Sequence, residues 1–165
     1  ERAGEVMGRL VPYVDVLIAN EEDAKDVFGI EAADTDIMGG KLNHEGYVSV
    51  ARQLTERFGC KAVAITLRGS ISASENNWAG MLYTGGQPFF SRNYLIRLVD
   101  RVGGGDSFGG GLIHALCKGM DEQSTIEFAV AASCLKQTIE HDFNLVSEKE
   151  VLALMGGNAS GRVQR

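Results

Sequence analysis

Short apolar runs that alternate with amphipathic segments are the feature that most limits how this chain can fold. Residues 14–19 and 62–67 are almost entirely apolar and rich in β-branched side chains, which is typical of strands covered on both faces of a sheet. Asn20 follows the first run and is placed to cap a helix with an acidic first turn, which Gly29 is placed to end. Strands alternating with helices predict an α/β fold in which a largely parallel sheet is flanked by helices.

The same kinds of signal extend to the rest of the chain. Apolar side chains recur every three or four residues from Val48 to Phe58, which predicts an amphipathic helix that ends at Gly59. The pair Gly85-Gly86 lies between two apolar triplets, as in the turn of an antiparallel hairpin. The other predicted elements are a strand over residues 94–99, a helix that follows Asp106 and ends at Gly119, and helices over residues 124–138 and from Ser147 to Gly156.

Length and charge exclude some classes of protein. The 165 residues, with a net charge of −6, favour a single domain over residues 1–165 and argue against binding of nucleic acid. Neither apolar run approaches the roughly 20 residues that cross a bilayer, and the first residues lack the regions of a secretion signal, which favours a cytoplasmic location. A start without Met raises the expectation of a piece of a longer protein. Three cysteines without metal-site spacing are predicted to be buried: Cys60, Cys117 and Cys134.

The segment from Asp100 to Asp106 carries the strongest functional signal. Gly103, Gly104 and Gly105 stand between a predicted strand and a predicted helix, where backbone N–H groups and the positive helix end converge with no Cβ atom in the way. This arrangement predicts an anion-binding site. Asp106, at the same helix end, would repel a resting phosphate, so we interpret it as the general base for a phosphoryl acceptor. From spacing alone, a helix cap at Asp106 within a glycine turn explains the pattern equally well.

The same segment resembles the carboxy-terminal signature D-x-x-G-x-G-D-x-F-x-x-G of the ribokinase-like (pfkB) carbohydrate kinases, which it matches from Asp100 to Gly111. The resemblance implies a ribokinase-like fold, of which this chain would form the carboxy-terminal portion. It also implies that Asp106 is the catalytic base and that the backbone of residues 103–105 forms the anion hole for the transferring phosphoryl group. ATP and Mg²⁺ are the cofactors that the resemblance implies.

Two further segments are similar to motifs of that family. Residues 20–23 stand where the family carries N-x-x-E, which implies that Asn20 and, through a shorter carboxylate, Asp23 organise Mg²⁺ and phosphates through water. From the residues alone, Asn20 is equally well a helix cap. Residues 66–70 stand where many members carry a T-L-G-x-x-G turn, and Arg68 replaces its first glycine. The nucleotide contacts that the resemblance implies here and at the helix beside the adenine pocket are Thr66, Arg68, Gly69, Ser133 and Lys136.

Within the family, residues 100–108, 142–147 and 160–165 are most similar to 2-keto-3-deoxygluconate kinases. The resemblance implies ATP-dependent phosphorylation of a keto sugar acid at its terminal hydroxyl, giving the 6-phosphate, and places the sugar-binding half and a small β lid outside this chain. A non-catalytic nucleotide- or phosphate-binding α/β module is the alternative. A monovalent cation near Asp100 and assembly into a homo-oligomer stay open at this point.

Overall fold

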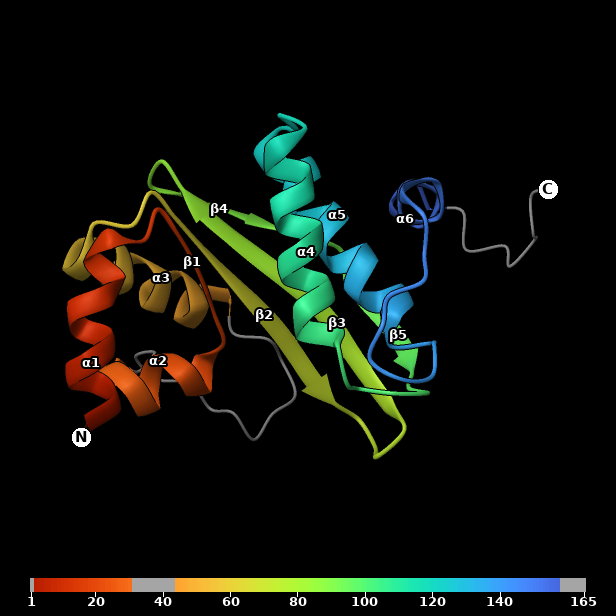
Figure 1. Ribbon diagram of the computed structural model, residues 1–165, viewed down its shortest axis with the longest axis horizontal. Coiled ribbons are helices and arrows are strands. Elements are labelled where there is room, and N and C mark those ends of the chain that lie inside the picture. Colours follow the sequence, from red (N-terminus) through yellow and green to blue (C-terminus); the bar gives the residue numbers. More distant parts are fainter. Residues whose placement is uncertain (1, 31–43, 158–165) are drawn as a thin grey trace.

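A five-stranded sheet with helices on both faces forms the molecule (Figure 1). The computed structural model describes residues 2–30 and 44–157. The strands are β1 (Val16–Ala19), β2 (Ala62–Ser70), β3 (Glu75–Thr84), β4 (Gln87–Phe90) and β5 (Tyr94–Arg97). The helices are α1 (Arg2–Leu10), the 3₁₀ turn η1 (Val11–Tyr13), α2 (Glu21–Phe28), α3 (His44–Phe58), α4 (Gly104–Cys117), α5 (Glu122–Lys136) and α6 (Glu148–Met155).

The α/β class is confirmed, but the described part of the sheet is mixed rather than largely parallel. β1 pairs with β2 in parallel, whereas β3 runs antiparallel to β2, β4 and β5. The physical reason is the connection between β2 and β3. Only residues 71–74 separate these strands, and so short a link can join antiparallel neighbours but not parallel ones.

The hairpin also overturns the predicted turn at residues 66–70. Strand β2 continues through these residues to Ser70, with Thr66 paired to Gly80, Arg68 to Trp78 and Ser70 to Asn76. The expected T-L-G-x-x-G turn is therefore wrong for this chain. Its residues lie on an extended strand, and the chain reverses only after them.

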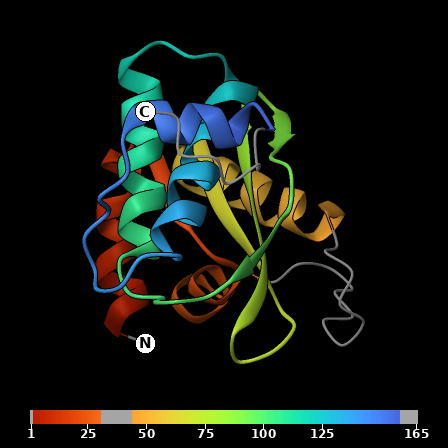
Figure 2. The same ribbon diagram turned by 90° about the vertical axis from the view of Figure 1, so that its right-hand side faces the viewer.

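Alternate side chains of β2 pack against opposite layers of helices. Val63, Ile65 and Leu67 belong to a core shared with α3, while Ala62 and Ala64 belong to a core shared with α4 and α5. Figure 2 shows α3 on one side of the strands and α4 on the other. Burial on both faces explains why this strand is so uniformly apolar.

Local signals for turns and caps are confirmed. Asn20 and Ser147 each form a reciprocal capping box at the start of α2 and α6. Gly85 and Gly86 connect β3 to β4 with φ angles of 57° and 77°, which few residues other than glycine adopt. Helix α4 starts at Gly104 and therefore includes Asp106, which was expected to precede it. Cysteine burial is only partly as predicted, because Cys117 is exposed near the end of α4.

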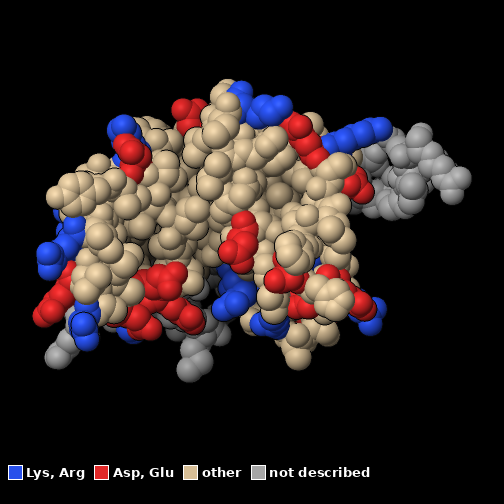
Figure 3. Space-filling model, viewed as in Figure 1, with Lys and Arg blue, Asp and Glu red and all other residues tan. Residues whose placement is uncertain are grey.

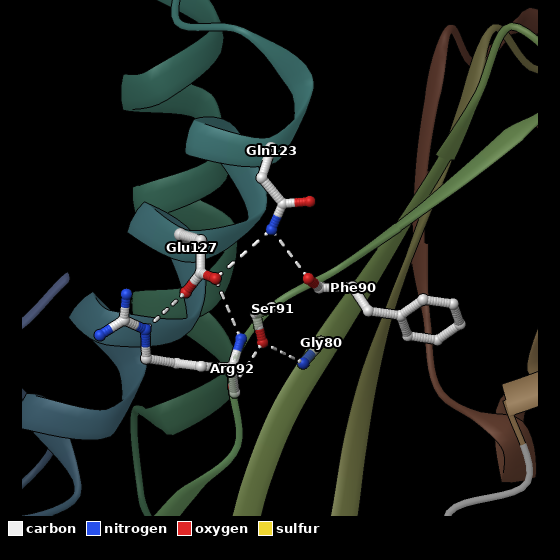
Figure 4. A network of polar contacts seen from close by, with 6 residues as sticks. All are labelled: Gly80, Phe90, Ser91, Arg92, Gln123 and Glu127. Atoms are coloured by element: carbon white, nitrogen blue, oxygen red, sulfur yellow. Dashed lines mark hydrogen bonds and ion pairs between the residues drawn. The ribbon is translucent and has the colours of Figure 1, made fainter. Parts of the chain in front are cut away.

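A polar clasp fixes α5 to the exit of β4 (Figure 4). Glu127 accepts the backbone N–H of Arg92 at 3.0 Å and pairs with the Arg92 Nε at 3.4 Å. Gln123 donates to the Phe90 carbonyl at 2.8 Å. These contacts fix the amino-terminal half of α5 against the sheet, while Ser133, nearer its carboxy-terminal end, contacts the start of α4. Within residues 2–30 and 44–157, no helix has the length and apolar character to cross a membrane.

Candidate functional site

Three consecutive glycines at the start of α4 are each required for a different reason. Gly103 has a φ of +76°, and a Cβ atom there would overlap the carbonyl of Asp142. Gly104 is buried, with Gln137 Cγ 3.3 Å from the position of a Cβ. At Gly105 a Cβ would meet nothing within 4 Å. The first two glycines therefore serve packing, whereas Gly105 keeps backbone open to the space beside it.

Residues 98–105, which we call the glycine loop, are held by side chains from neighbouring segments. Asp100 accepts the backbone N–H of Val102 at 3.0 Å and that of His141 at 3.1 Å. These two hydrogen bonds hold the pKa of the Asp100 carboxyl below its ordinary value, and the one from Val102 has the larger effect. From α5, the buried hydroxyl of Ser133 donates to the Gly104 carbonyl at 2.7 Å. The glycine loop is thus fixed by contacts independent of any ligand.

A cavity of about 210 Å³ lies beside the glycine loop, and we call it the loop cavity. It brings together side chains from the start of α2, from β2 and β3 and from the residue after α5 with the first turn of α4. Four of the residues singled out from the sequence line it, namely Asn20, Thr66, Arg68 and Gly105. The other lining residues are Glu22, Asn76, Trp78, Arg101 and Gln137. Segments more than 80 positions apart in the sequence thus converge on one polar space.

Two buried polar groups in the loop cavity have no hydrogen-bond partner. Asn76 is 1 % exposed and Trp78 is 7 % exposed, yet the Asn76 Oδ1 and the Trp78 Nε1 are both unpaired. Leaving a buried polar atom unpaired costs about 1–3 kcal/mol, so such atoms call for a partner from outside the chain. The loop cavity therefore has the character of a site for a polar ligand.

Sequence reasoning missed Asn76 and assigned Trp78 no role, because their place depends on strand register. They lie opposite Ser70 and Arg68 on β3, and alternation along a strand puts both on the cavity side. Arg101 was also left out of the predicted site. Its guanidinium donates to the Ala73 carbonyl at 3.0 Å, which ties the β2–β3 turn to the glycine loop.

Electrostatics in this region favour an anion beside a carboxylate. Arg68 and Arg101 both line the loop cavity with Gly105, whose N–H lacks an acceptor within the helix because it belongs to the first turn. Acidic side chains gather over α2 in Figure 3, and basic side chains lie next to them near the start of α4. The positive side chains and the helix end thus face the same small space.

Asp106 follows Gly105 in the first turn of α4 and lies at a second cavity. Its side chain is exposed and lines a space of about 520 Å³, together with Gly110, His114, Phe128 and Asp142. Adjacent residues of one helical turn therefore face two cavities. An anion held at Gly105 and a proton acceptor at Asp106 would be neighbours, as phosphoryl transfer to a hydroxyl requires.

The predicted Mg²⁺ residues are occupied in capping α2. Asn20 Oδ1 accepts the Asp23 N–H at 2.7 Å, and the Asp23 carboxylate accepts the Asn20 N–H at 3.1 Å. Asn20 lines the loop cavity, but the carboxylate that lines it is Glu22 rather than Asp23. No cluster of three or more potential ligands occurs among the described residues. This donor set fits a Mg²⁺ ion carried by phosphates and water, the usual mode for nucleotide-bound Mg²⁺, rather than a protein cage.

Three other predicted contacts lie away from the loop cavity. Gly69 lies on β2, is paired with Asn77 of β3 and does not line the cavity. Ser133 and Lys136 are both fully buried, and each donates to a backbone carbonyl. Because neither side chain reaches the surface, we do not retain Ser133 and Lys136 as nucleotide contacts.

Comparisons with known proteins show what this chain is similar to. The model of the pfkB family carbohydrate kinases matches residues 2–140. A 2-dehydro-3-deoxygalactonokinase from Haloferax volcanii is 28 % identical over 152 residues, covering 92 % of this chain and 41 % of the relative. The crystal structure of 2-dehydro-3-deoxygluconokinase from Thermotoga maritima superposes with a TM-score of 0.87 and 48 % identity, over 94 % of this chain and 45 % of that one.

A pfkB family carbohydrate kinase from Listeria grayi gives a TM-score of 0.80 at 30 % identity, again over 94 % of this chain and 45 % of that one. The chain therefore spans less than half the length of these relatives. The family match covers the glycine loop, the loop cavity and Asp106. On this evidence, the chain belongs to the pfkB family of carbohydrate kinases.

Proposed function

We propose that the protein transfers a phosphoryl group from ATP to the terminal hydroxyl of a 2-keto-3-deoxy sugar acid. The observation that carries the proposal is the first turn of α4, where Gly105 lines the loop cavity and Asp106 follows it on the adjacent cavity. The names of the Thermotoga and Haloferax relatives support the substrate class. This chain would supply the nucleotide-binding part and the base, with sugar recognition in the portion of the relatives that it does not cover.

The phosphate chain of ATP is proposed to occupy the loop cavity. Arg68 and Arg101 offer guanidinium donors, and Gly105 offers an N–H at the positive end of α4. The unpaired Trp78 Nε1 would gain an acceptor from a phosphate oxygen, and the Asn76 Oδ1 would gain a donor from bound water. The same ligand thus explains the cationic lining and the unpaired buried atoms.

Mg²⁺ fits the acidic side of this cavity. Glu22 and the Asn20 side chain would hold it through water, and when bound it would neutralise charge on the transferring phosphates. The residues of the chain do the remaining work. The capping box fixes Asn20, and the first turn of α4 holds the Gly105 N–H at the loop cavity before the phosphates arrive.

Asp106 is proposed to accept the proton of the attacking hydroxyl. Its carboxylate is exposed, so a sugar hydroxyl can approach it directly. As the new P–O bond forms, the hydroxyl proton passes to Asp106, the bond between the γ-phosphorus and the bridging oxygen breaks, and ADP leaves with that oxygen. Charge that develops on the transferring group would face the Gly105 N–H at the start of α4.

The names of the two relatives differ in the sugar acid, gluconate or galactonate, so an experiment has to decide which of the two epimers is the substrate. 2-Keto-3-deoxygluconate is our first candidate, because the 48 % identical Thermotoga relative bears the gluconokinase name. The galactonate epimer is the second, from the 28 % identical Haloferax relative. The catalytic efficiency of the protein on each of the two acids, compared with ATP in excess, decides between them.

Calorimetric titration with ATP and Mg²⁺ tests the nucleotide site without a choice of sugar. A valine at Gly104 would push into Gln137 and displace the glycine loop, so Gly104→Val should abolish saturable binding. Gly8→Val is the matched control, because a Cβ at Gly8 meets nothing within 4 Å. Binding that survives in folded Gly104→Val would contradict the proposed site. Nucleotide binding without phosphorylation of either acid by the protein would favour a non-catalytic binding module.

A further inference from the structure

Lys136 is a fully buried cation at the base of the glycine loop. It is the last residue of α5 and is 0 % exposed. Its Nζ donates to the Ile139 carbonyl at 3.3 Å. Burying an ammonium group is costly unless nearby oxygen atoms and negative charge compensate for the lost water. The burial of this charge therefore indicates that Lys136 has a role other than packing.

The segment that carries the Ile139 carbonyl is stitched to the glycine loop. The Gln137 carbonyl accepts the N–H groups of Val99 at 2.9 Å and of Asp100 at 3.3 Å. His141, which has a φ of +66°, donates its N–H to Asp100 Oδ2 at 3.1 Å. The chain just after α5 and the chain just before α4 thus form one hydrogen-bonded unit, and the ammonium group lies at its edge.

Asp100 supplies the opposite charge in this unit. Its two oxygen atoms accept from Val102 on the glycine loop and from His141 on the segment after α5. The positive charge of Lys136 adds to these two hydrogen bonds in lowering the pKa of the Asp100 carboxyl. Lys136 thus places a positive charge on the segment that Asp100 joins to the glycine loop.

We propose that the Lys136 ammonium is a built-in cation that positions the glycine loop, in place of a free monovalent cation near Asp100. This inference rests on the proposed function, since it treats the glycine loop as the phosphate-binding element. Lys136 is a positioning residue, because its side chain is enclosed and cannot touch ATP or sugar. The link runs from the ammonium to the Ile139 carbonyl and along the segment after α5 to the His141 N–H, which Asp100 accepts. Asp100 in turn holds Val102, which precedes Gly103, and the conformation of Gly103 sets the first turn of α4.

A tethered cation has a consequence that a diffusible one lacks. Its occupancy does not depend on the salt composition of the medium, so potassium or ammonium should not stimulate the wild-type protein. Removing the side chain should create a small space lined by the Ile139 carbonyl and near the Asp100 carboxylate. Oxygen atoms of this kind suit a small monovalent cation, which could then replace the lost charge.

Three variants of the whole protein test the proposal at constant ionic strength. Lys136→Ala should bind MgATP at least about tenfold more weakly, a loss of about 1.4 kcal/mol. Potassium or ammonium should restore most of that loss, while the bulky tetramethylammonium ion should not. Lys136→Met keeps the volume without the charge and should stay impaired in every salt. Lys118→Met is the control, since Lys118 is exposed, follows the far end of α4 and pairs with Glu148 of α6.

Hydrogen exchange at the amides of residues 100–105 gives a readout that needs no activity. In Lys136→Met these amides should exchange about tenfold faster or more, while amides of α3 keep their wild-type rates. Strong stimulation of the wild type by potassium, or wild-type exchange and affinity in Lys136→Met, would overturn the proposal. If Lys136→Ala folds only with ammonium or potassium present, the inference is supported. A wild type without nucleotide binding refutes the proposed function instead, and the exchange experiment still decides the role of Lys136.

Discussion

Replacing Gly105 with alanine should separate folding from nucleotide binding. A Cβ at Gly105 meets no atom within 4 Å, and the residue lies in the first turn of α4. Alanine favours a helix interior over glycine by about 1 kcal/mol, which is an upper bound in a first turn. For a protein of this size the gain corresponds to a Tm higher by at most about 4 °C. Gly105→Ala should therefore be as stable as the wild type or slightly more stable.

The same methyl group should weaken binding, because it enters the loop cavity where a phosphate oxygen has to approach the N–H groups. Loss of one hydrogen bond to a charged group costs about 1.5–3 kcal/mol. The Kd for MgATP should then rise by about 10- to 150-fold. Calorimetric titration measures the affinity, and thermal unfolding of the same samples measures stability.

Gly103→Ala is the matched comparison, because it lies two residues before Gly105 and should have the opposite effect on stability. A left-handed φ costs a residue with a Cβ about 1–2 kcal/mol, and overlap with the Asp142 carbonyl adds a packing cost of about 1–3 kcal/mol. A total of about 3 kcal/mol would lower the Tm by about 6–12 °C. Wild-type affinity in folded Gly105→Ala would refute the phosphate site, and equal stability of the two variants would refute the loop geometry.

Three further predictions concern the fold and its charges. Exposed Cys117 should react rapidly with a thiol reagent in the native protein. Burial raises the pKa of the Cys134 thiol to about 12 and that of the Cys60 thiol above its ordinary value, so both should react only on unfolding. Rapid loss of all three thiols would contradict the packing. The pKa of Asp100 is lowered in the folded state, so its contribution to stability is present above its ordinary pKa of 3.8 and is lost as the pH falls through the lower folded value. In this acidic range, the stability of Asp100→Ala should depend less steeply on pH than that of the wild type. An identical profile in acid unfolding would argue against the two hydrogen bonds that Asp100 accepts. Gly80→Ala should destabilise the protein by about 1–3 kcal/mol, because its Cβ would lie 2.7 Å from a side-chain atom of α5. Calorimetric unfolding measures this change, and a variant as stable as the wild type would show that α5 does not pack on β3 as described.

Signals that span a few residues predicted much of this structure correctly. The caps at Asn20 and Ser147 and the hairpin at Gly85 depend on contacts within three or four positions, which a sequence displays directly. The strand at residues 62–67 was found because burial imposes an apolar composition on it. The strand expected over residues 94–99 is found over Tyr94–Arg97. Their pairing was not found, since register and direction depend on partners elsewhere in the chain.

That dependence explains the errors in the site. Thr66 and Arg68 were placed on a turn by the resemblance to the T-L-G-x-x-G motif, whereas their extended conformation depends on antiparallel pairing of β2 with a strand distant from that motif. Asp23 was chosen over Glu22 by its place in the motif. One residue along a helix turns the side chain by about 100°, and the side chain that reaches the loop cavity is that of Glu22. Burial of Lys136 could not be predicted, because a cation near a helix end is ordinarily solvated. Sequence located the glycine loop, and only tertiary structure shows what surrounds it.

The central claim is that Asp106 is the base of a phosphoryl transfer whose phosphates lie at the neighbouring glycine. The most direct measurement is a comparison of wild-type protein and Asp106→Asn for both MgATP affinity and turnover of 2-keto-3-deoxygluconate. Asparagine retains the size of the side chain but does not accept the proton, so kcat should fall by about 100-fold or more while the Kd for MgATP stays within about threefold. Turnover at the wild-type rate in Asp106→Asn, with binding intact, would contradict the account.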